Sequence, residues 1–135
     1  MDKPKVRNTL NSKKLGVRNR RKGHNYEREL AKEFRDIGFE RCRTTRESSK
    51  LLDSCKIDLD LPDLNVQAKN VIGGVNYLKV FALMDEHLKL KIPERLDLPK
   101  VIFHKRKGRE LVIIEKDYFF RLLIQLNESD EKTIY

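Results

Sequence analysis

The sequence predicts an α/β protein in which helices flank a single mixed β-sheet. Segments with apolar residues at helical spacing alternate along the chain with short segments that are rich in β-formers or that alternate apolar and polar residues. Pro-Asp and Lys-Gly pairs between neighbouring strand segments are typical of turns. With 135 residues, the chain is long enough for one domain with its own core.

The excess positive charge of the chain is concentrated in residues 1–22. This segment carries nine Lys or Arg and a single acid, Asp2, so it contributes +8 to a formal net charge of +9. Its few apolar residues cannot bury enough surface to fold alone, which predicts a flexible basic arm. Such an arm binds nucleic-acid phosphates without sequence preference, and its candidate contacts include Arg18, Arg20, Arg21 and Lys22. The alternative is a tail that only keeps the protein in solution.

Residues 24–37 are expected to form the first helix of a folded domain that spans residues 23–126. Apolar side chains recur at helical spacing, Asn25 is a candidate N-cap, and Gly38 follows the last turn. Glu27 borders the apolar stripe, so its carboxylate could reach over the neighbouring sheet. The alternative is an exposed glutamate that is stabilised by the helix dipole.

A first strand is expected at residues 39–46, and a loop at residues 47–54. The strand carries three basic side chains that are candidate contacts to a nucleic-acid backbone, namely Arg41, Arg43 and Arg46. The loop brings serine hydroxyls and the carboxylate of Asp53 towards the next element.

Residues 56–69 predict a β-hairpin with Pro62 and Asp63 in its turn. A two-residue loop sets Leu61 opposite Leu64, Asp60 opposite Asn65, Asp58 opposite Gln67 and Lys56 opposite Lys69. One face of the hairpin is then apolar, and the other holds carboxylates, amides and lysines. Carboxylate and amide oxygens bind Mg²⁺, and a lysine stabilises charge that develops on a phosphate. The alternative is an ordinary amphipathic hairpin whose polar face contacts water.

The second half of the chain predicts the rest of the sheet and two more helices. After a Gly-Gly connection, residues 77–91 have helical spacing, and residues 100–105 and 110–115 form a second hairpin around a basic turn. A last helix is expected from Asp117 to about Leu126, with inward side chains at Tyr118, Leu122, Leu123 and Leu126. Residues 127–135 form a polar C-terminal tail that is expected to fray.

Composition excludes several other classes of protein. The two cysteines, Cys42 and Cys55, have no metal-ligand spacing and no disulfide framework, which indicates free thiols in a reducing compartment. No apolar run reaches the length of a membrane span, and the N-terminus lacks the apolar core of a signal peptide. We therefore expect a soluble, cytoplasmic protein with no membrane partner. Tryptophan is absent and aromatics are sparse, which disfavours an RNA-binding module that stacks bases.

Several motifs together resemble the archaeal-type Holliday junction resolvases and their phage and bacterial relatives, which belong to the PD-(D/E)XK nuclease superfamily. The resemblance runs from about residue 20 to residue 70, and its order and spacing are more specific than any single piece. The pieces are Arg21-Lys22-Gly23, Glu27-Arg28-Glu29-Leu30, Gly38-Phe39, Arg43, Ser54-Cys55-Lys56-Ile57-Asp58-Leu59 and Gln67-Ala68-Lys69.

The resemblance implies a restriction-endonuclease-like fold and a homodimer that nicks four-way DNA junctions during recombination, in a bacterial, archaeal or phage-infected cell. It implies that Asp58 is the central ligand of Mg²⁺, with Mn²⁺ as a substitute, and that Glu27 helps to hold the metal. It also implies that Lys69 is the lysine of the motif and that Ser54 lies near the scissile phosphate. Arg21, Lys22 and Arg43 resemble contacts to the DNA backbone.

The sequence departs from the motif at Gln67, which stands where the second acid is usual. A glutamine offers a carbonyl oxygen to a metal but no negative charge, so it binds the metal less strongly. We expect Asp60 to stay outside the metal site, because its hairpin partner is Asn65. Two alternatives remain at this stage: a nuclease of the same superfamily that acts on other branched or linear DNA, and a DNA-binding module without catalysis.

Overall fold

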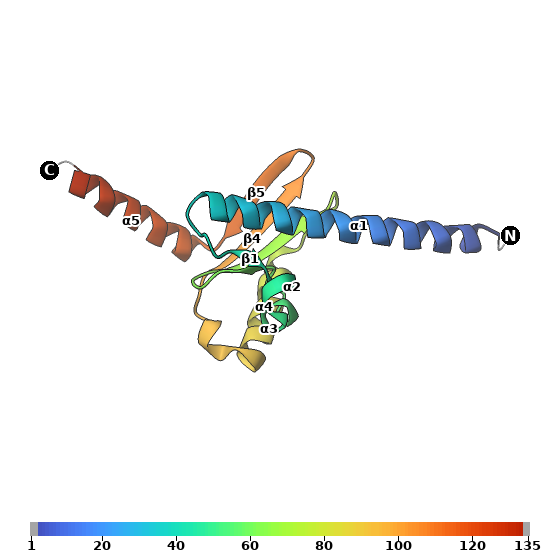
Figure 1. The fold of residues 1–135 in the computed structure, drawn as a ribbon, viewed down its shortest axis with the longest axis horizontal. Coiled ribbons are helices and arrows are strands. Elements are labelled where there is room, and N and C mark those ends of the chain that lie inside the picture. The colour runs from blue at the N-terminus through green and yellow to red at the C-terminus, as the bar shows by residue number, and fades with distance from the viewer. Residues whose placement is uncertain (1–2, 134–135) are drawn as a thin grey trace.

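The structure is a computed structural model that describes the backbone of residues 3–133 and the side chains of residues 13–130. It is an α/β fold with one five-stranded mixed sheet and helices on both faces (Figure 1). Its elements are α1 (Lys3–Asp36), β1 (Arg43–Thr44), α2 (Thr45–Ser48), α3 (Lys50–Ser54), β2 (Leu59–Asp60), β3 (Asn65–Asn70), α4 (Tyr77–Lys91), the 3₁₀ helix η1 (Pro93–Arg95), β4 (Lys100–Arg106), β5 (Arg109–Ile114) and α5 (Lys116–Thr133).

The strands lie in the sheet in chain order, from β1 at one edge to β5 at the other. Three neighbouring pairs are antiparallel, and only β3 and β4 run parallel. Parallel neighbours need a crossover connection, and α4 supplies it between β3 and β4. The predicted class, a mixed sheet flanked by helices, is therefore confirmed.

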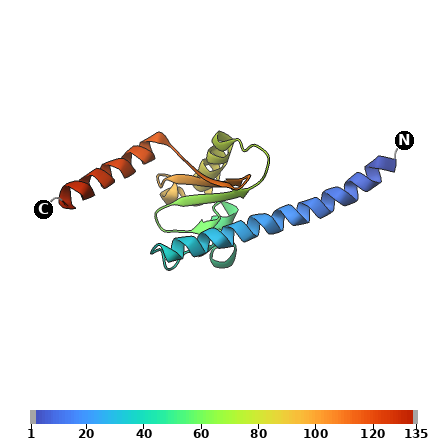
Figure 2. The ribbon, with the colours of Figure 1, turned by 90° about the horizontal axis from the view of Figure 1, so that it is seen from above.

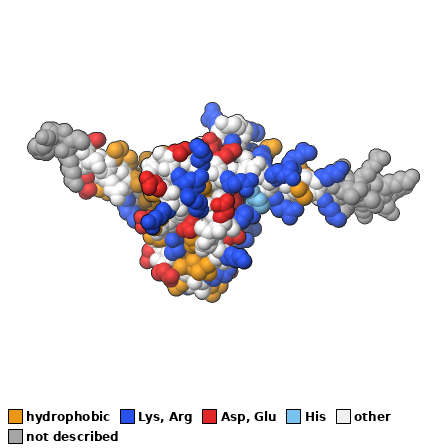
Figure 3. All heavy atoms as spheres, in the orientation of Figure 1, with side chains coloured by type: hydrophobic (Ala, Val, Ile, Leu, Met, Phe, Trp, Pro, Cys, Tyr) orange, Lys and Arg blue, Asp and Glu red, His pale blue; other side chains and the backbone are white. Residues whose placement is uncertain are grey.

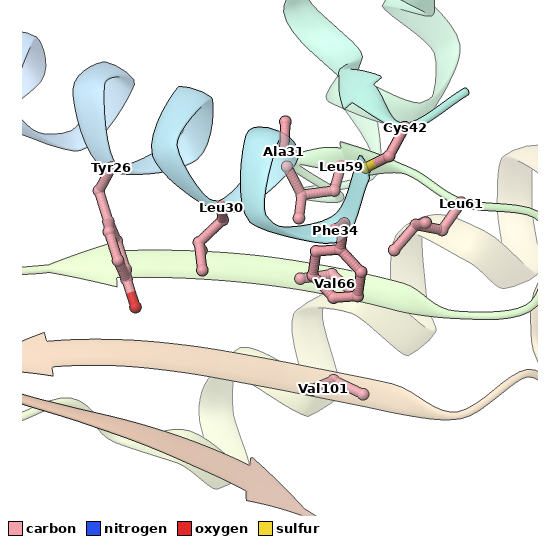
Figure 4. Packing of buried hydrophobic residues seen from close by; sticks show 9 residues of the cluster. All are labelled: Tyr26, Leu30, Ala31, Phe34, Cys42, Leu59, Leu61, Val66 and Val101. Carbon is pink, nitrogen blue, oxygen red and sulfur yellow. The ribbon is translucent and has the colours of Figure 1, made fainter. Parts of the chain in front are cut away.

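Helix α1 covers one face of the sheet. Its side chains Tyr26, Leu30 and Phe34 point towards β3 and β4, where they meet Val66 and Val101 (Figure 4). Phe34 also makes an edge-to-face contact with Phe103, with 5.7 Å between the ring centroids. The predicted helical stripe is thus the one that is buried, because its 3.6-residue period matches one face of α1.

The opposite face of the sheet is covered by α4 (Figure 2), and the short helix α3 packs against α4. A second apolar cluster joins Ile57 to α3 and α4, and its members are Leu52, Cys55, Met84, Leu88 and Ile92. Both cysteines are free and buried, as expected from their spacing.

Two helices extend beyond the body of the molecule in opposite directions (Figure 1). From Lys13 onward, the described side chains of the projecting part of α1 include many Lys and Arg, and apolar side chains gather on α5 (Figure 3). No helix within residues 3–133 combines the length and the apolar character that crossing a membrane requires.

The predicted start of the first helix, near Asn25, is wrong. Helix α1 begins at Lys3, so residues 3–22 continue the packed helix outward and are not an irregular arm. Met1 and Asp2 lie outside the described residues. The prediction placed the start where the apolar stripe begins, whereas Lys and Arg are good helix formers that propagate an existing helix without packing.

Other element boundaries also differ from the prediction. The first strand is only Arg43–Thr44, and residues 47–54 fall mainly in α2 and α3 rather than in a loop. The last helix runs on to Thr133 through most of the predicted polar tail, while residues 134–135 lie outside the described residues. Its side chains Leu122, Leu123 and Leu126 are exposed, so their predicted inward orientation is wrong, and only Tyr118 packs on the core.

Candidate functional site

The site begins with a tight turn that ends α3. Lys56 has φ of 66°, and the amide of Ile57 donates to the carbonyl of Leu52 at 3.2 Å. A residue in the left-handed region after the last helical turn reverses the chain and satisfies the terminal carbonyls. The turn sends Ile57 into the second core cluster and places Asp58 directly before β2.

The predicted hairpin and its register are confirmed. Leu59 lies opposite Val66, as a two-residue loop at Pro62 and Asp63 requires. The amide of Asp58 donates to the carbonyl of Val66 at 2.8 Å, which extends the pairing by one residue. The predicted pair of Lys56 with Lys69 is wrong, because Lys56 belongs to the preceding turn and not to β2.

The polar face of the hairpin is covered in part, and this also differs from the prediction. Asn65 is fully buried, and its side-chain amide donates to the carbonyl of Arg95 at 2.9 Å. The Arg95 guanidinium in turn donates to the Asn65 oxygen at 3.0 Å and to the carbonyl of Leu61 at 2.8 Å. Asn65 and Arg95 therefore anchor the hairpin turn to η1, and Asn65 is structural.

Asp58 is the central acid of the site. Burial first, and repulsion from Glu27 second, raise its pKa from the ordinary 3.8 to about 7. The amide of Ala68 donates to Asp58 Oδ2 at 2.8 Å, and this bond and the charge of Lys69 lower the pKa without cancelling the rise. At neutral pH, Asp58 is therefore close to its pKa, and a positive charge that enters the site would favour its ionised form.

Glu27 reaches the site from α1, as the sequence predicted. It is buried, and it lies near enough to Asp58 for its negative charge to raise the pKa of that carboxyl group. Arg46 of α2 forms an ion pair with Glu27, with 3.2 Å between Nη2 and Oε2. Arg46 was predicted as a contact to DNA, and the structure instead gives it a partner within the site.

Gln67 and Lys69 follow on β3, two residues apart and so on the same face of the strand. Gln67 is buried, and its Oε1 has no hydrogen-bond partner among the described residues. Lys69 is half-buried and lies beside the buried His104 of β4. The Tyr77 hydroxyl lies 2.7 Å from His104 Nδ1, which ties the start of α4 to this part of the sheet.

Asp60 and Ser54 have partners elsewhere. The Ser48 hydroxyl donates to Asp60 Oδ2 at 2.8 Å, and Arg43 is the strand neighbour of Asp60. The Ser54 hydroxyl donates to the carbonyl of Leu51 at 2.6 Å, and its own carbonyl accepts from Lys91. The structure therefore brings together Glu27, Asp58, Gln67 and Lys69, and the contacts that it gives Ser54 are to α3 and α4.

Basic side chains surround this set. The four candidate contacts on α1, Arg18, Arg20, Arg21 and Lys22, are exposed, as are Arg41 and Arg43. A cavity of about 310 Å³ between α1, β1 and α2 is lined by three arginines, namely Arg28, Arg35 and Arg43, together with Glu47. Arg28 and Arg35 were not predicted, although their spacing of seven residues places them on one face of the helix.

The donor set can be compared with the needs of a divalent metal ion. Within the described residues, no group of three or more His, Cys, Asp or Glu side chains could hold a metal. The available oxygens are the carboxylates of Asp58 and Glu27 and the unpartnered Oε1 of Gln67. These are hard oxygen donors, and Mg²⁺ is typically bound by one or two carboxylates with water in the remaining positions. The residues present therefore fit Mg²⁺ better than Zn²⁺, for which nitrogen and sulfur are the usual ligands.

Comparisons of the chain with models of protein families, with curated proteins and with solved structures give no match.

Proposed function

We propose that the protein is a metal-dependent DNA endonuclease, and that its preferred substrate is a four-way junction. The observation that carries the proposal is the site itself. Two mutually repelling carboxylates, Asp58 and Glu27, lie with the unpartnered oxygen of Gln67 and with Lys69, and the pKa of Asp58 is raised to about 7. Acids with perturbed pKa values cluster at functional sites, and a metal ion held by carboxylates can activate water for hydrolysis.

The order of elements supports the same class of nuclease. A helix that carries one acid precedes three antiparallel strands, and a crossover helix then leads to a fourth strand parallel to the third. We propose that this part of the chain is a restriction-endonuclease-like core, as the motif resemblance implies. Asp58 lies at the start of β2 and Lys69 within β3, so the hairpin register fixes their separation.

Each residue of the site has a distinct proposed role. Asp58, Glu27 and Gln67 would hold Mg²⁺, which would neutralise phosphate charge and make water a better nucleophile. Lys69 stabilises the charge that develops on the phosphate. The amide of Ala68 fixes the Asp58 carboxylate, and Arg46 neutralises Glu27 until substrate and metal arrive.

The basic surface supports a DNA substrate rather than a small phosphate ester. Exposed cations extend from the site along α1, and the cavity of about 310 Å³ is lined by Arg28, which directly follows Glu27, by Arg35 of α1 and by Arg43 of β1. Two duplex arms or strands can therefore be held on either side of the cut. A junction needs two symmetric nicks, so the proposal includes a homodimer with one site in each copy.

The test is cleavage of a labelled, immobile four-way junction beside a linear duplex with the same arms. We expect paired nicks in the junction with Mg²⁺ or Mn²⁺ and no product with chelator. Asp58→Asn should reduce the rate by at least about a thousandfold, because it removes the central charge of the site.

Asp60→Asn is the matched control. Asp60 lies two residues after Asp58 on the same hairpin and accepts a hydrogen bond from the Ser48 hydroxyl. It should keep the rate within about threefold of the parent protein. Equal loss in both variants would refute the assignment of Asp58. Tight junction binding without any cleavage would favour a DNA-binding module. In such a module, the replacement of the motif's second acid by Gln67 would have accompanied the loss of catalysis.

A further inference from the structure

The cavity between α1, β1 and α2 combines a volume of about 310 Å³ with an excess of positive charge. Its lining residues are Arg28, Ala31, Arg35, Arg43, Thr44 and Glu47, and we call it the arginine cavity. Three guanidinium groups against one carboxylate give the lining a formal charge of +2. Ala31 and Thr44 are buried, whereas Arg28 and Arg43 are exposed, so the arginines lie where the cavity meets solvent.

The three arginines are held in place and still have donors for a ligand. Arg35 and Arg43 both donate to the carbonyl of Cys42, at 2.8 Å and 2.9 Å, and Arg28 donates to the side chain of Asn25. None of the three forms an ion pair within the described part of the chain. Each guanidinium has more N–H donors than these bonds use. Because the shared carbonyl keeps two like charges close together, an anion between them would relieve their repulsion.

The charge and the number of donors indicate which anion fits. Arginine binds carboxylates and phosphates through paired hydrogen bonds. A carboxylate or an internal phosphodiester offers a single negative charge and two free oxygens. A phosphomonoester carries a charge of about −1.5 to −2 near pH 7 and has three terminal oxygens, which match the lining charge of +2 and the three guanidinium groups. The volume of about 310 Å³ lies at the lower end of the range for ligand pockets and leaves room for an attached sugar.

The arginine cavity adjoins the proposed metal site through two pairs of consecutive residues. Glu27 precedes Arg28 on α1, and Arg46 precedes Glu47 on α2. In each pair the first member belongs to the Glu27–Arg46 ion pair, and the second lines the cavity. Hydrolysis of a phosphodiester adds water to phosphorus and breaks one P–O bond, so it leaves one phosphomonoester end and one hydroxyl end. The cavity is therefore next to the place where the proposed reaction would form such an end.

We propose that the arginine cavity binds the phosphomonoester at the end of a nucleic-acid strand. Arg28, Arg35 and Arg43 bind the phosphate, and no metal is needed, so the inference goes beyond the proposed cleavage. Only the origin of the strand end as a cleavage product rests on the proposed function. The same chemistry fits a 5′-phosphate and a 3′-phosphate, and the experiment distinguishes the two.

The test is the affinity of the full chain for short oligonucleotides of one sequence, measured in chelator by fluorescence anisotropy with an internal label. One strand ends in a 5′-phosphate, one in a 3′-phosphate, and one in hydroxyl groups only. At least one phosphorylated strand should bind about tenfold more tightly than the hydroxyl strand, because charge-assisted hydrogen bonds are added. Equal affinity for all three strands would overturn the proposal. Inorganic phosphate that binds as tightly as the phosphorylated strand would overturn the strand end as its source.

Two variants with opposite changes of charge test the cavity itself. Arg28→Gln should weaken binding of the phosphorylated strand by about tenfold and remove most of its advantage over the hydroxyl strand. Glu47→Gln should increase that advantage, because it removes the one carboxylate of the lining, and a damaged fold cannot produce such a gain. Lys89→Gln and Glu86→Gln are the matched controls, since both residues are exposed on α4, and they should leave the advantage unchanged. An advantage that survives Arg28→Gln in full would refute the assignment.

The readouts also separate this inference from the nuclease proposal. Asp58→Asn should keep the preference for a phosphorylated end, whatever it does to cleavage. Absence of cleavage with this preference intact would count against the nuclease alone. Metal-dependent cleavage without the preference would count against the arginine cavity alone.

Discussion

A single carboxylate determines the chemistry that the site can perform. Asp58 is half-buried beside a second acid, and the one amide and one lysine that favour its charged form do not offset burial and repulsion. Its pKa is about 7, against an ordinary value of 3.8. A cation that enters the site removes a proton from Asp58, so metal binding and protonation compete.

The first prediction concerns pH. Between about pH 4 and pH 7, Asp58 is protonated in the folded protein and ionised in the unfolded chain, so the folded state binds more protons. The free energy of unfolding in chelator should therefore fall as pH rises through this window. Mg²⁺ affinity should rise with pH, by up to tenfold per unit below pH 7. Urea unfolding and calorimetric Mg²⁺ titration at several pH values measure the two effects.

Asp58→Asn supplies the control for that prediction. The amide does not titrate, so the decrease in stability between pH 4 and pH 7 should largely disappear. A decrease of the same size in this variant would show that another group is responsible and would contradict the assignment.

Most of the proposed site residues could be chosen from the sequence, because their spacing on a hairpin and a helix is local. Asp58, Gln67 and Lys69 follow from period-two alternation, and Glu27 from the edge of a helical stripe. The pairing of Arg46 with Glu27 could not be predicted, since it depends on α2, which the sequence suggested was a loop. The burial of Asn65 was missed for a related reason, because its partner Arg95 is 30 positions away.

At the scale of elements, the turn between α3 and β2 carries a conformational cost. Lys56 occupies the left-handed region at φ 66° although glycine is preferred there. Lys56→Gly should raise the free energy of unfolding by about 1 kcal/mol, because it removes the clash of Cβ with the backbone. Urea denaturation measures the change.

Lys107→Gly is the matched control for Lys56→Gly. Lys107 also has positive φ, at 50°, but it lies in the distant turn between β4 and β5. Both variants should gain stability, and neither should change Mg²⁺ affinity. A loss of stability in Lys56→Gly alone would mean that the lysine side chain contributes more than its backbone strain costs.

The projecting half of α1 is the element that we propose contacts DNA. Replacing Arg18, Arg20, Arg21 and Lys22 by Gln should lower the slope of log affinity against log salt by roughly 3 to 4, because each cation releases about one counterion on duplex DNA. Fluorescence anisotropy with a labelled duplex at several salt concentrations measures the slope.

The control for the α1 variant neutralises four exposed lysines on other elements, namely Lys79, Lys89, Lys91 and Lys107. It changes the net charge by the same amount and should lower the slope by less than half as much. Equal changes in slope would mean that binding depends on total charge and not on α1.

Sequence periodicity predicted the elements that pack and failed for those that do not. Residues 77–91 were placed correctly because Phe81, Met84 and Leu88 give α4 a buried side. The outer half of α1 and the end of α5 contact no core in the described structure. Their sequences therefore lack the periodic apolar residues from which a helix can be predicted. The short helices α2 and α3 are four and five residues long, too short for a period to be read.

At the scale of the whole molecule, the order of helices and strands could be predicted and the shape could not. The alternation of helices and strands gave the mixed sheet, and α4 made one pair of strands parallel. Neither the outward course of α1 nor that of α5 is encoded in local spacing. The prediction assumed that every apolar stripe is buried within the chain, whereas the apolar side chains Leu122, Leu123 and Leu126 of α5 are exposed.

The continuity of α1 has a mechanical consequence. One unbroken helix carries the exposed cations at its outer end and Glu27 where it meets the sheet, and the 14 residues from Lys13 to Glu27 span roughly 21 Å, about the width of a DNA duplex. Tyr26 and Leu30, which lie on either side of Glu27 in the sequence, anchor this part of α1 on the sheet. The position of Glu27 relative to Asp58 is therefore fixed by the packed turns of α1 and not by the course of the projecting turns.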